Sequence, residues 1–214
     1  MCWPQRPVSL SANEESPFST IHTMPNDMKP IIFLDMDDVL VISQSFTSYQ
    51  VITNFKTTDI DTWPELWEGL IFPEGKANLT ALHDEFFPQY VLSSSWTNYL
   101  TKEQMQIIFR RTGLECIAEN LHNQWTTPKG SQSSRLEEIE QWIAEHGTPN
   151  QKMLILDDYE SGWSLNKSGL EKKGLVVLCD AYTGLVTDKL VEAQKRIRKQ
   201  DADRAKYSRV PGKE

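Results

Sequence analysis

The sequence predicts an α/β domain with a doubly wound, mostly parallel, five-stranded sheet, and two observations support this. Short apolar runs typical of strands buried on both faces recur along the chain. Amphipathic segments with helical spacing lie between these runs. Strands that alternate with helices pair in parallel and are covered by helices on both faces, so this order favours a doubly wound sheet.

Five apolar runs are the expected strands. The first follows Pro30 and ends at Asp35, and the last ends at Cys179 and Asp180. The third run, LECIAE, is the weakest because it mixes acidic and apolar residues. The expected strands span residues 31–35, 90–92, 114–119, 153–156 and 175–178.

Three helices are expected between the strands. Apolar residues spaced i, i+3 and i+7 within residues 79–86 predict the first helix. The second and third are predicted from capping boxes, in which Ser or Thr is followed three residues later by Gln or Glu. These pairs are Thr101 with Gln104 and Ser134 with Glu137.

Composition and charge exclude several classes of protein. No stretch approaches 18 uncharged apolar residues, which excludes a membrane-spanning helix. Three scattered cysteines are too few for a disulfide framework or a zinc cluster, so free thiols in a reducing, cytoplasmic setting are expected. A net charge of −8, from 22 basic and 30 acidic residues, argues against a broad duplex-binding surface.

The chain is expected to divide into three parts. Residues 1–28 are rich in Pro, Ser, Thr and Asn without periodicity, which predicts a flexible leader. Residues 29–195 form the domain, with a small insert at about 41–75 after the first strand. Residues 196–214 form a basic C-terminal tail, for which a solvated helix end is the favoured interpretation.

Polar residues that directly follow the apolar runs are the candidate site, because ligands of open α/β sheets bind beyond the carboxyl ends of the strands. Asp35 and Asp37 follow the first strand, residues 93–95 are serines after the second, and Asp157 and Asp158 follow the fourth. If these strands are neighbours, four carboxylates converge, and their repulsion calls for a cation. An all-oxygen set of ligands suits Mg²⁺.

The order of these segments resembles the haloacid dehalogenase (HAD) superfamily. IIFLDMDDVL is similar to its first motif, VLSSSW to its second and MLILDD to its fourth. Together with the pattern R-x-x-E-I-x-x-W at 135–142 and the Gly-Leu pair at 184–185, they resemble the HAD domains associated with Swiss Army knife RNA repair proteins over about residues 30–195. The resemblance implies a HAD-like Rossmannoid fold with a small cap insert after the first strand.

The resemblance also implies a phosphomonoester hydrolase that forms an aspartyl-phosphate. Asp35 would be the nucleophile and Asp37 the general acid and base. Ser94 would hydrogen-bond the phosphoryl oxygens, with Ser93 as the alternative and Ser95 as a further substrate contact.

The resemblance assigns two further roles, to a cation and to metal ligands. Arg135 fits the cation of the third motif, and Lys129, a further candidate contact to the substrate, is the alternative. Mg²⁺ would be held by Asp35, by the backbone carbonyl of Asp37 and by Asp158, and Asp157 would be an additional or more distant ligand.

The expected substrate is a phosphorylated nucleic-acid end, a nucleotide or a phosphoprotein, because a small cap leaves the site open to large molecules by analogy with the family. Trp63 and Trp67 in the insert could stack on a base, although packing against the core is favoured. Two alternatives are a protein phosphatase and a non-catalytic interaction module on the same scaffold. Phosphotransfer and dehalogenation are less favoured, and the sequence indicates no oligomeric state.

Overall fold

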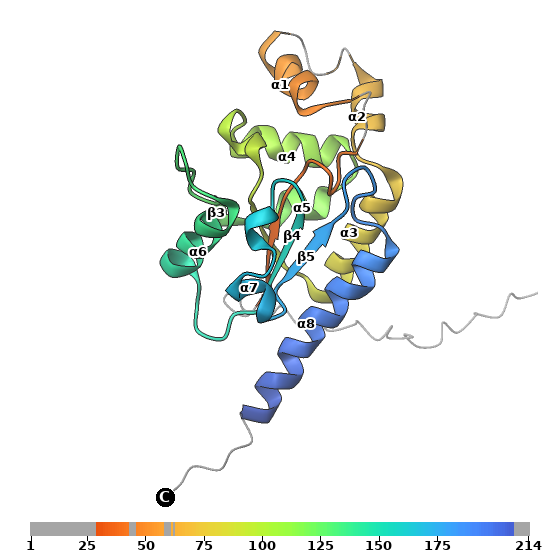
Figure 1. Cartoon of the computed structure of the whole chain (residues 1–214). Helices are drawn as coiled ribbons and strands as arrows, with labels where there is room; N and C mark the ends of the chain where they lie inside the picture. Colours follow the sequence, from red (N-terminus) through yellow and green to blue (C-terminus); the bar gives the residue numbers. More distant parts are fainter. Residues whose placement is uncertain (1–28, 43–45, 58–60, 62, 208–214) are drawn as a thin grey trace, which may run out of the picture.

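The computed structural model describes residues 29–42, 46–57, 61 and 63–207 (Figure 1). The expected leader and the last seven residues of the expected tail lie outside the described residues. The described part forms a five-stranded parallel sheet flanked by helices, which confirms the predicted doubly wound α/β fold.

The order of the strands in the sheet is β3-β2-β1-β4-β5, and every pairing is parallel. The chain runs outward from β1 through β2 to β3, then crosses back to β4 and β5 on the other side of β1. The order therefore reverses between β1 and β4, and crevices for ligands form at such switch points. The strands are β1 (Ile31–Leu34), β2 (Gln89–Leu92), β3 (Leu121–Thr126), β4 (Met153–Asp158) and β5 (Val176–Cys179).

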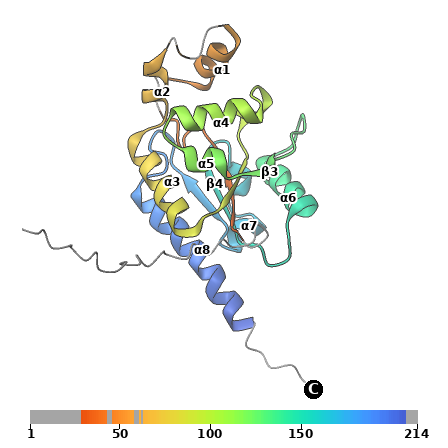
Figure 2. The ribbon, with the colours of Figure 1, turned by 180° about the vertical axis from the view of Figure 1, so that it is seen from behind.

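Helices cover both faces of the sheet. The sheet separates two apolar clusters, one on each face. On one face pack α3 (Pro73–Phe86), α4 (Lys102–Arg111), α5 (Glu115–Glu119) and α8 (Thr187–Tyr207), and the reverse view shows α3 beside α8 (Figure 2). On the other face pack α6 (Arg135–His146), the 3-10 helix η3 (Trp163–Leu165) and α7 (Gly169–Lys172). On this second face Trp142 packs edge-on against Phe33, which anchors α6 to β1.

Both predicted capping boxes are present. At the start of α4 the Thr101 hydroxyl accepts from the backbone N–H of Gln104, whose side chain accepts from the backbone N–H of Thr101. Ser134 and Glu137 make the same reciprocal bonds at the start of α6. These local bonds fix where both helices begin, because they satisfy backbone donors that the helix itself leaves free.

The prediction of a strand over residues 114–119 was wrong. Glu115–Glu119 is the short helix α5, and its buried residues Ile117 and Ala118 lie three and four positions after the buried Leu114, as helical spacing requires. The strand lies just beyond it, as β3, at the edge of the sheet. An edge strand is half exposed, so the mostly polar sequence LHNQWT forms it without the apolar run that marks a buried strand.

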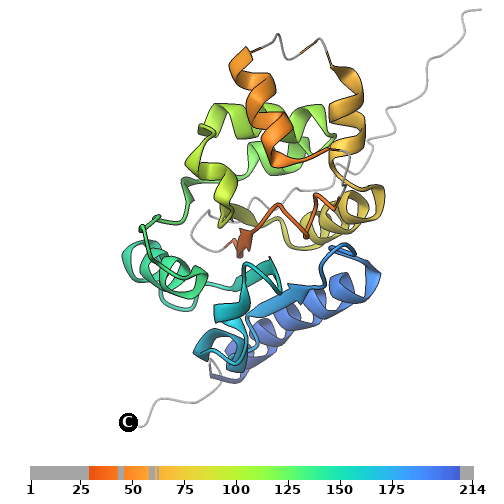
Figure 3. The same cartoon turned by 45° about the horizontal axis from the view of Figure 1, so that its top comes forward.

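The insert after β1 contributes α1 (Ser48–Thr57) and α2 (Pro64–Leu70), which lie at the top of Figure 1. Figure 3 shows α1 (orange) in front of α4. Trp67 is buried and lies edge-on to Phe55, so it packs in the core rather than offering a free stacking surface.

Helix α8 runs through the boundary expected at residue 195. Ile197 is buried in the core, and the Gln200 side chain hydrogen-bonds both backbone groups of Met153. The first part of the expected tail is therefore packed on the domain. Although α8 is 21 residues long, no helix within the described ranges has the length and apolar character needed to cross a bilayer.

Replacing Gly184 by Ala is expected to lower the free energy of unfolding by about 1–3 kcal/mol. Gly184 has φ 69°, and an added Cβ would lie 2.8 Å from the carbonyl oxygen of Val39. Urea unfolding measures the change. Gly169→Ala is the matched control, since its Cβ would meet nothing within 4 Å, and it is expected to leave stability unchanged or slightly higher. Equal stabilities of the two variants would contradict this account.

Candidate active site

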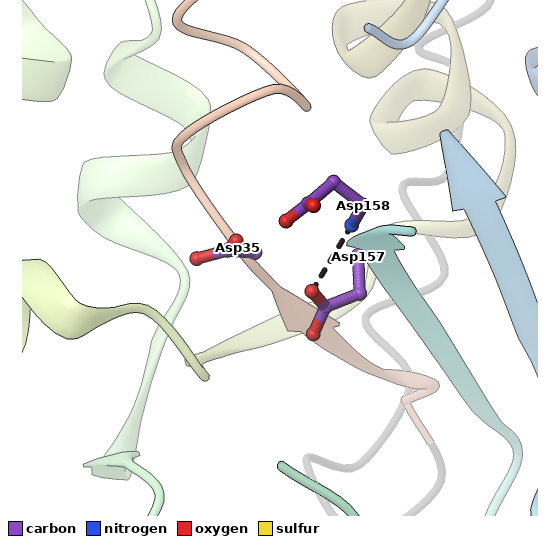
Figure 4. Close-up of side chains that lie close together, drawn as sticks. All are labelled: Asp35, Asp157 and Asp158. Carbon is purple, nitrogen blue, oxygen red and sulfur yellow. Dashed lines mark hydrogen bonds between the residues drawn. The ribbon is translucent and has the colours of Figure 1, made fainter. Parts of the chain in front are cut away.

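Three carboxylates meet where β1 and β4 end (Figure 4). Leu34 pairs with Leu156, so Asp35, just after β1, lies level with Asp157 of β4, and Asp158 ends β4. One oxygen of each carboxylate lies within 4.8 Å of the others. The exposed fractions of Asp35, Asp157 and Asp158 are only 2%, 0% and 3%.

Burial governs the electrostatics of this cluster. It raises the pKa of Asp35 to about 6, although the charge of Arg135 opposes the shift. It also raises the pKa of Asp157 well above its usual range, and the nearby charge of Asp35 adds to the effect. A group of buried like charges of this kind favours either bound protons or a bound cation.

Arg135 is the cation nearest to the acids. Its Nε lies 2.9 Å from Asp157 Oδ2 and its Nη2 lies 3.6 Å from Asp35 Oδ1. Burial lowers the pKa of Arg135, but the charges of Asp157 and Asp35 outweigh it and raise the pKa overall. One guanidinium leaves most of the charge of three carboxylates uncompensated, and their oxygens are ligands that fit a hard divalent cation.

The carboxyl of Asp37 lies outside the three-acid cluster and accepts from a tryptophan. The indole Nε1 of Trp96 donates to Asp37 Oδ2 at 2.9 Å. Burial raises the pKa of Asp37, and the bond from Trp96 opposes the shift. The carboxyl of Asp37 is not among the clustered metal-ligand candidates of the described residues, and the predicted role of its backbone carbonyl stays a prediction.

The three serines after β2 have different surroundings. Ser94 is buried and hydrogen-bonds Asp35, which lowers the pKa of that carboxyl. Ser93 is also buried, but its hydroxyl has no hydrogen-bond partner within the described residues. Ser95 is exposed and begins the 3-10 helix η2 (Ser95–Asn98). Of the two alternatives for the second motif, Ser94 is therefore the one beside the candidate nucleophile.

An open hollow of about 190 Å³ adjoins the acids. Lys129 lies in its wall, and its Nζ is 2.8 Å from Glu138 Oε2. Burial lowers the pKa of Lys129, and the hydrogen bond to Glu138 opposes the shift. Both candidate cations thus reach this hollow, but Arg135 is the one that contacts the acids. The lining residues are Ser95, Asn98, Lys129, Ser133, Arg135, Glu138 and Ser161.

The comparison with known families agrees with this geometry. The model of the HAD domain in Swiss Army Knife RNA repair proteins matches residues 31–190, well over half of the chain. The chain belongs to this HAD family. The match confirms the resemblance seen in the motifs and places the chain in a superfamily of hydrolases and phosphatases. No curated protein and no solved structure matches the chain.

Ser161 contacts the clustered acids, although it was not predicted from the sequence. Its hydroxyl lies 3.1 Å from Asp35 Oδ2 and 3.1 Å from Asp157 Oδ1, and it also contacts Asp158 Oδ2. The backbone N–H of Ser161 donates to Asp158 Oδ1, so a tight turn after β4 returns this side chain to the acids. A Ser three residues after paired acids was the available signal, since Asp at such turns commonly accepts from the backbone two or three residues on.

Mg²⁺ is expected to raise the unfolding temperature of this HAD protein, because a bound cation offsets the repulsion among the three acids. At 100 times the dissociation constant, the gain is about 2.7 kcal/mol. Asp158→Asn is expected to remove the Mg²⁺-induced shift. It keeps an oxygen acceptor for the turn and removes one repelling charge, so stability without metal should not fall. Calorimetry of the full chain measures both effects.

The control for this measurement is Asp84→Asn, because Asp84 is exposed on α3 at a distance from the site. This variant is expected to keep the full shift. An Mg²⁺-induced shift in Asp158→Asn as large as in the wild type would contradict a metal site at the clustered acids.

Proposed function

We propose that this HAD protein is a Mg²⁺-dependent phosphomonoester hydrolase that forms an aspartyl-phosphate on Asp35. One observation carries the proposal: Asp35 is buried among carboxylates and beside Arg135, while Asp37, two residues on, is held separately by Trp96. The two acids thus have different environments, as a nucleophile and a general acid require.

In the first step an oxygen of Asp35 attacks phosphorus, and the bond from phosphorus to the leaving oxygen breaks. Asp37 gives its proton to that oxygen, a role that suits a carboxyl whose pKa burial has raised. In the second step Asp37 takes a proton from water, and the hydroxide attacks phosphorus. This releases phosphate and restores the carboxylate of Asp35.

The remaining side chains bind and orient the phosphoryl group. Ser94 already hydrogen-bonds Asp35 and would donate to a phosphoryl oxygen in its place. Arg135 would bind the oxygens beside Asp35, and Lys129 and Ser95 reach the same hollow. Preorganised charges and donors of this kind supply most of the rate in phosphoryl transfer.

Asp35, Asp157 and Asp158, with the backbone carbonyl of Asp37, are the residues that would hold Mg²⁺. When bound, the cation supplies the positive charge that lets an anionic nucleophile approach an anionic phosphate. Ser161, which contacts all three carboxylates, would fix their orientation. The complete set of acids argues against the alternative of a non-catalytic interaction module.

Asp35→Asn is expected to lower hydrolysis of p-nitrophenyl phosphate by about 10³-fold or more, because an amide cannot form the phosphoryl intermediate. A chelator should abolish hydrolysis by the wild type, and Mg²⁺ should restore it. Phosphate release from 5′- and 3′-phosphorylated oligonucleotides is measured alongside. Asp84→Asn is the control and should keep full activity. Hydrolysis by the Asp35→Asn variant, or hydrolysis by the wild type in the presence of the chelator, would contradict the proposal.

Trp96→Phe is expected to lower kcat about tenfold, since Asp37 loses a hydrogen bond to its charged form, worth about 1.5–3 kcal/mol. Trp142→Phe is the matched control. It also removes a buried indole N–H that donates at 2.9 Å, in this case to the Gln124 carbonyl. Both variants should lose stability, but only Trp96→Phe should lose kcat, because Trp142→Phe keeps an aromatic ring against Phe33 and so keeps α6 in place. Equal losses of kcat would show that the effect is merely structural.

A further inference from the structure

A second hollow, of about 510 Å³, lies between α1 and the end of η2. Its volume is within the range of about 300–1,000 Å³ usual for pockets that bind small molecules. It is lined by Ser48, Tyr49, Ile52, Thr53, Lys56 and Tyr99, so α1 supplies every lining residue except the last.

The two hollows are neighbours along η2. Ser95 and Asn98 line the hollow beside the acids, and Tyr99, the next residue, lines the second one. Consecutive Cα atoms are about 3.8 Å apart, so this segment is a shared wall. A ligand in the hollow beside the acids therefore has the second hollow across this segment.

Two exposed tyrosine rings dominate the second hollow. Tyr49 is 75% exposed and Tyr99 is 62% exposed, so both rings present their apolar surface to solvent. Further exposed aromatic residues follow β4 and β5, at the same edge of the sheet, and one of them begins η3. They are Tyr159, Trp163 and Tyr182. Exposed rings around a phosphate site provide surfaces on which nucleobases stack.

The charges of the second hollow suit a short ligand. Lys56 is exposed and supplies a positive charge to the lining of this hollow, whereas the whole chain carries a net charge of −8. One cation beside two rings fits a single base and its adjacent phosphodiester, while the acidic chain disfavours a long electrostatic track. A peptide that binds by strand addition would need an open strand edge to pair with, and the helix α1 offers none.

We propose that Tyr49, Lys56 and Tyr99 form a nucleoside subsite, which binds the terminal base of a single-stranded nucleic-acid end whose phosphate lies at Asp35. This inference rests on the proposed phosphatase function and names its substrate class. The rings stack on the base, and Lys56 pairs with the next phosphodiester.

The kinetic test uses single-stranded hexanucleotides phosphorylated at the 5′ or 3′ end, with ribose 5-phosphate as a substrate that lacks a base. Tyr49→Ala and Tyr99→Ala are each expected to lower kcat/KM for the preferred hexanucleotide about tenfold, mainly through KM. Hydrolysis of ribose 5-phosphate should stay within about twofold of the wild type. Tyr49→Phe and Tyr99→Phe keep the rings and should keep the activity.

The control variant is Phe87→Ala, since Phe87 is 60% exposed but lies before β2, at the opposite edge of the sheet. It should leave kcat/KM for the hexanucleotide unchanged. Equal losses on both substrates, no loss with either Ala variant, or faster turnover of a phosphotyrosine peptide than of the hexanucleotides would overturn the subsite.

A binding measurement separates this inference from the proposed function. Fluorescence anisotropy follows a labelled, phosphorylated hexanucleotide on the Asp35→Asn protein with Mg²⁺, where turnover is blocked. Adding Tyr99→Ala should weaken binding about tenfold. If the wild type hydrolyses no phosphate ester but this loss is seen, the subsite holds and the phosphatase fails. If ribose 5-phosphate is hydrolysed and Tyr99→Ala leaves binding unchanged, the phosphatase holds and the subsite fails.

Discussion

Mutual repulsion among three buried carboxylates is the constraint on which the rest of this structure depends. Asp35, Asp157 and Asp158 lie within 4.8 Å of one another and are almost wholly excluded from solvent. Burying such charges costs free energy unless they are paired, protonated or bound to a metal. The packed sheet beneath them therefore holds an arrangement that the acids alone would not adopt.

The fold offsets part of this cost with groups that come from distant parts of the chain. Arg135 occupies the first turn of α6, where the helix dipole disfavours a cation, but its contacts with Asp35 and Asp157 compensate for that position. The capping box at Ser134 fixes where the helix begins, and Trp142 packs α6 against the β1 side chain Phe33. A cap and a core contact thus set the position of the guanidinium.

The segment after β2 connects the chemistry to the proposed recognition of the substrate. Ser94 bonds Asp35, Trp96 holds Asp37, and Tyr99 lines the hollow against α1. These residues lie within one short 3-10 helix and its flanks, so a single segment contacts both acids and lines the second hollow. The insert that supplies α1 accordingly completes the second hollow without closing the first.

The sequence by itself determined the elements whose cause is local. Apolar runs fixed β1, β2, β4 and β5, capping boxes fixed the starts of α4 and α6, and the acids at the strand ends marked the site. Only the tertiary structure decided β3, whose polar sequence becomes a strand because it pairs with β2 at an edge. It also decided the bond between Trp96 and Asp37, 59 residues apart, and the return of Ser161 to the acids. The physical reason is that propensity, capping and periodicity act over a few residues, whereas a contact between distant side chains exists only after the sheet has brought their strands together.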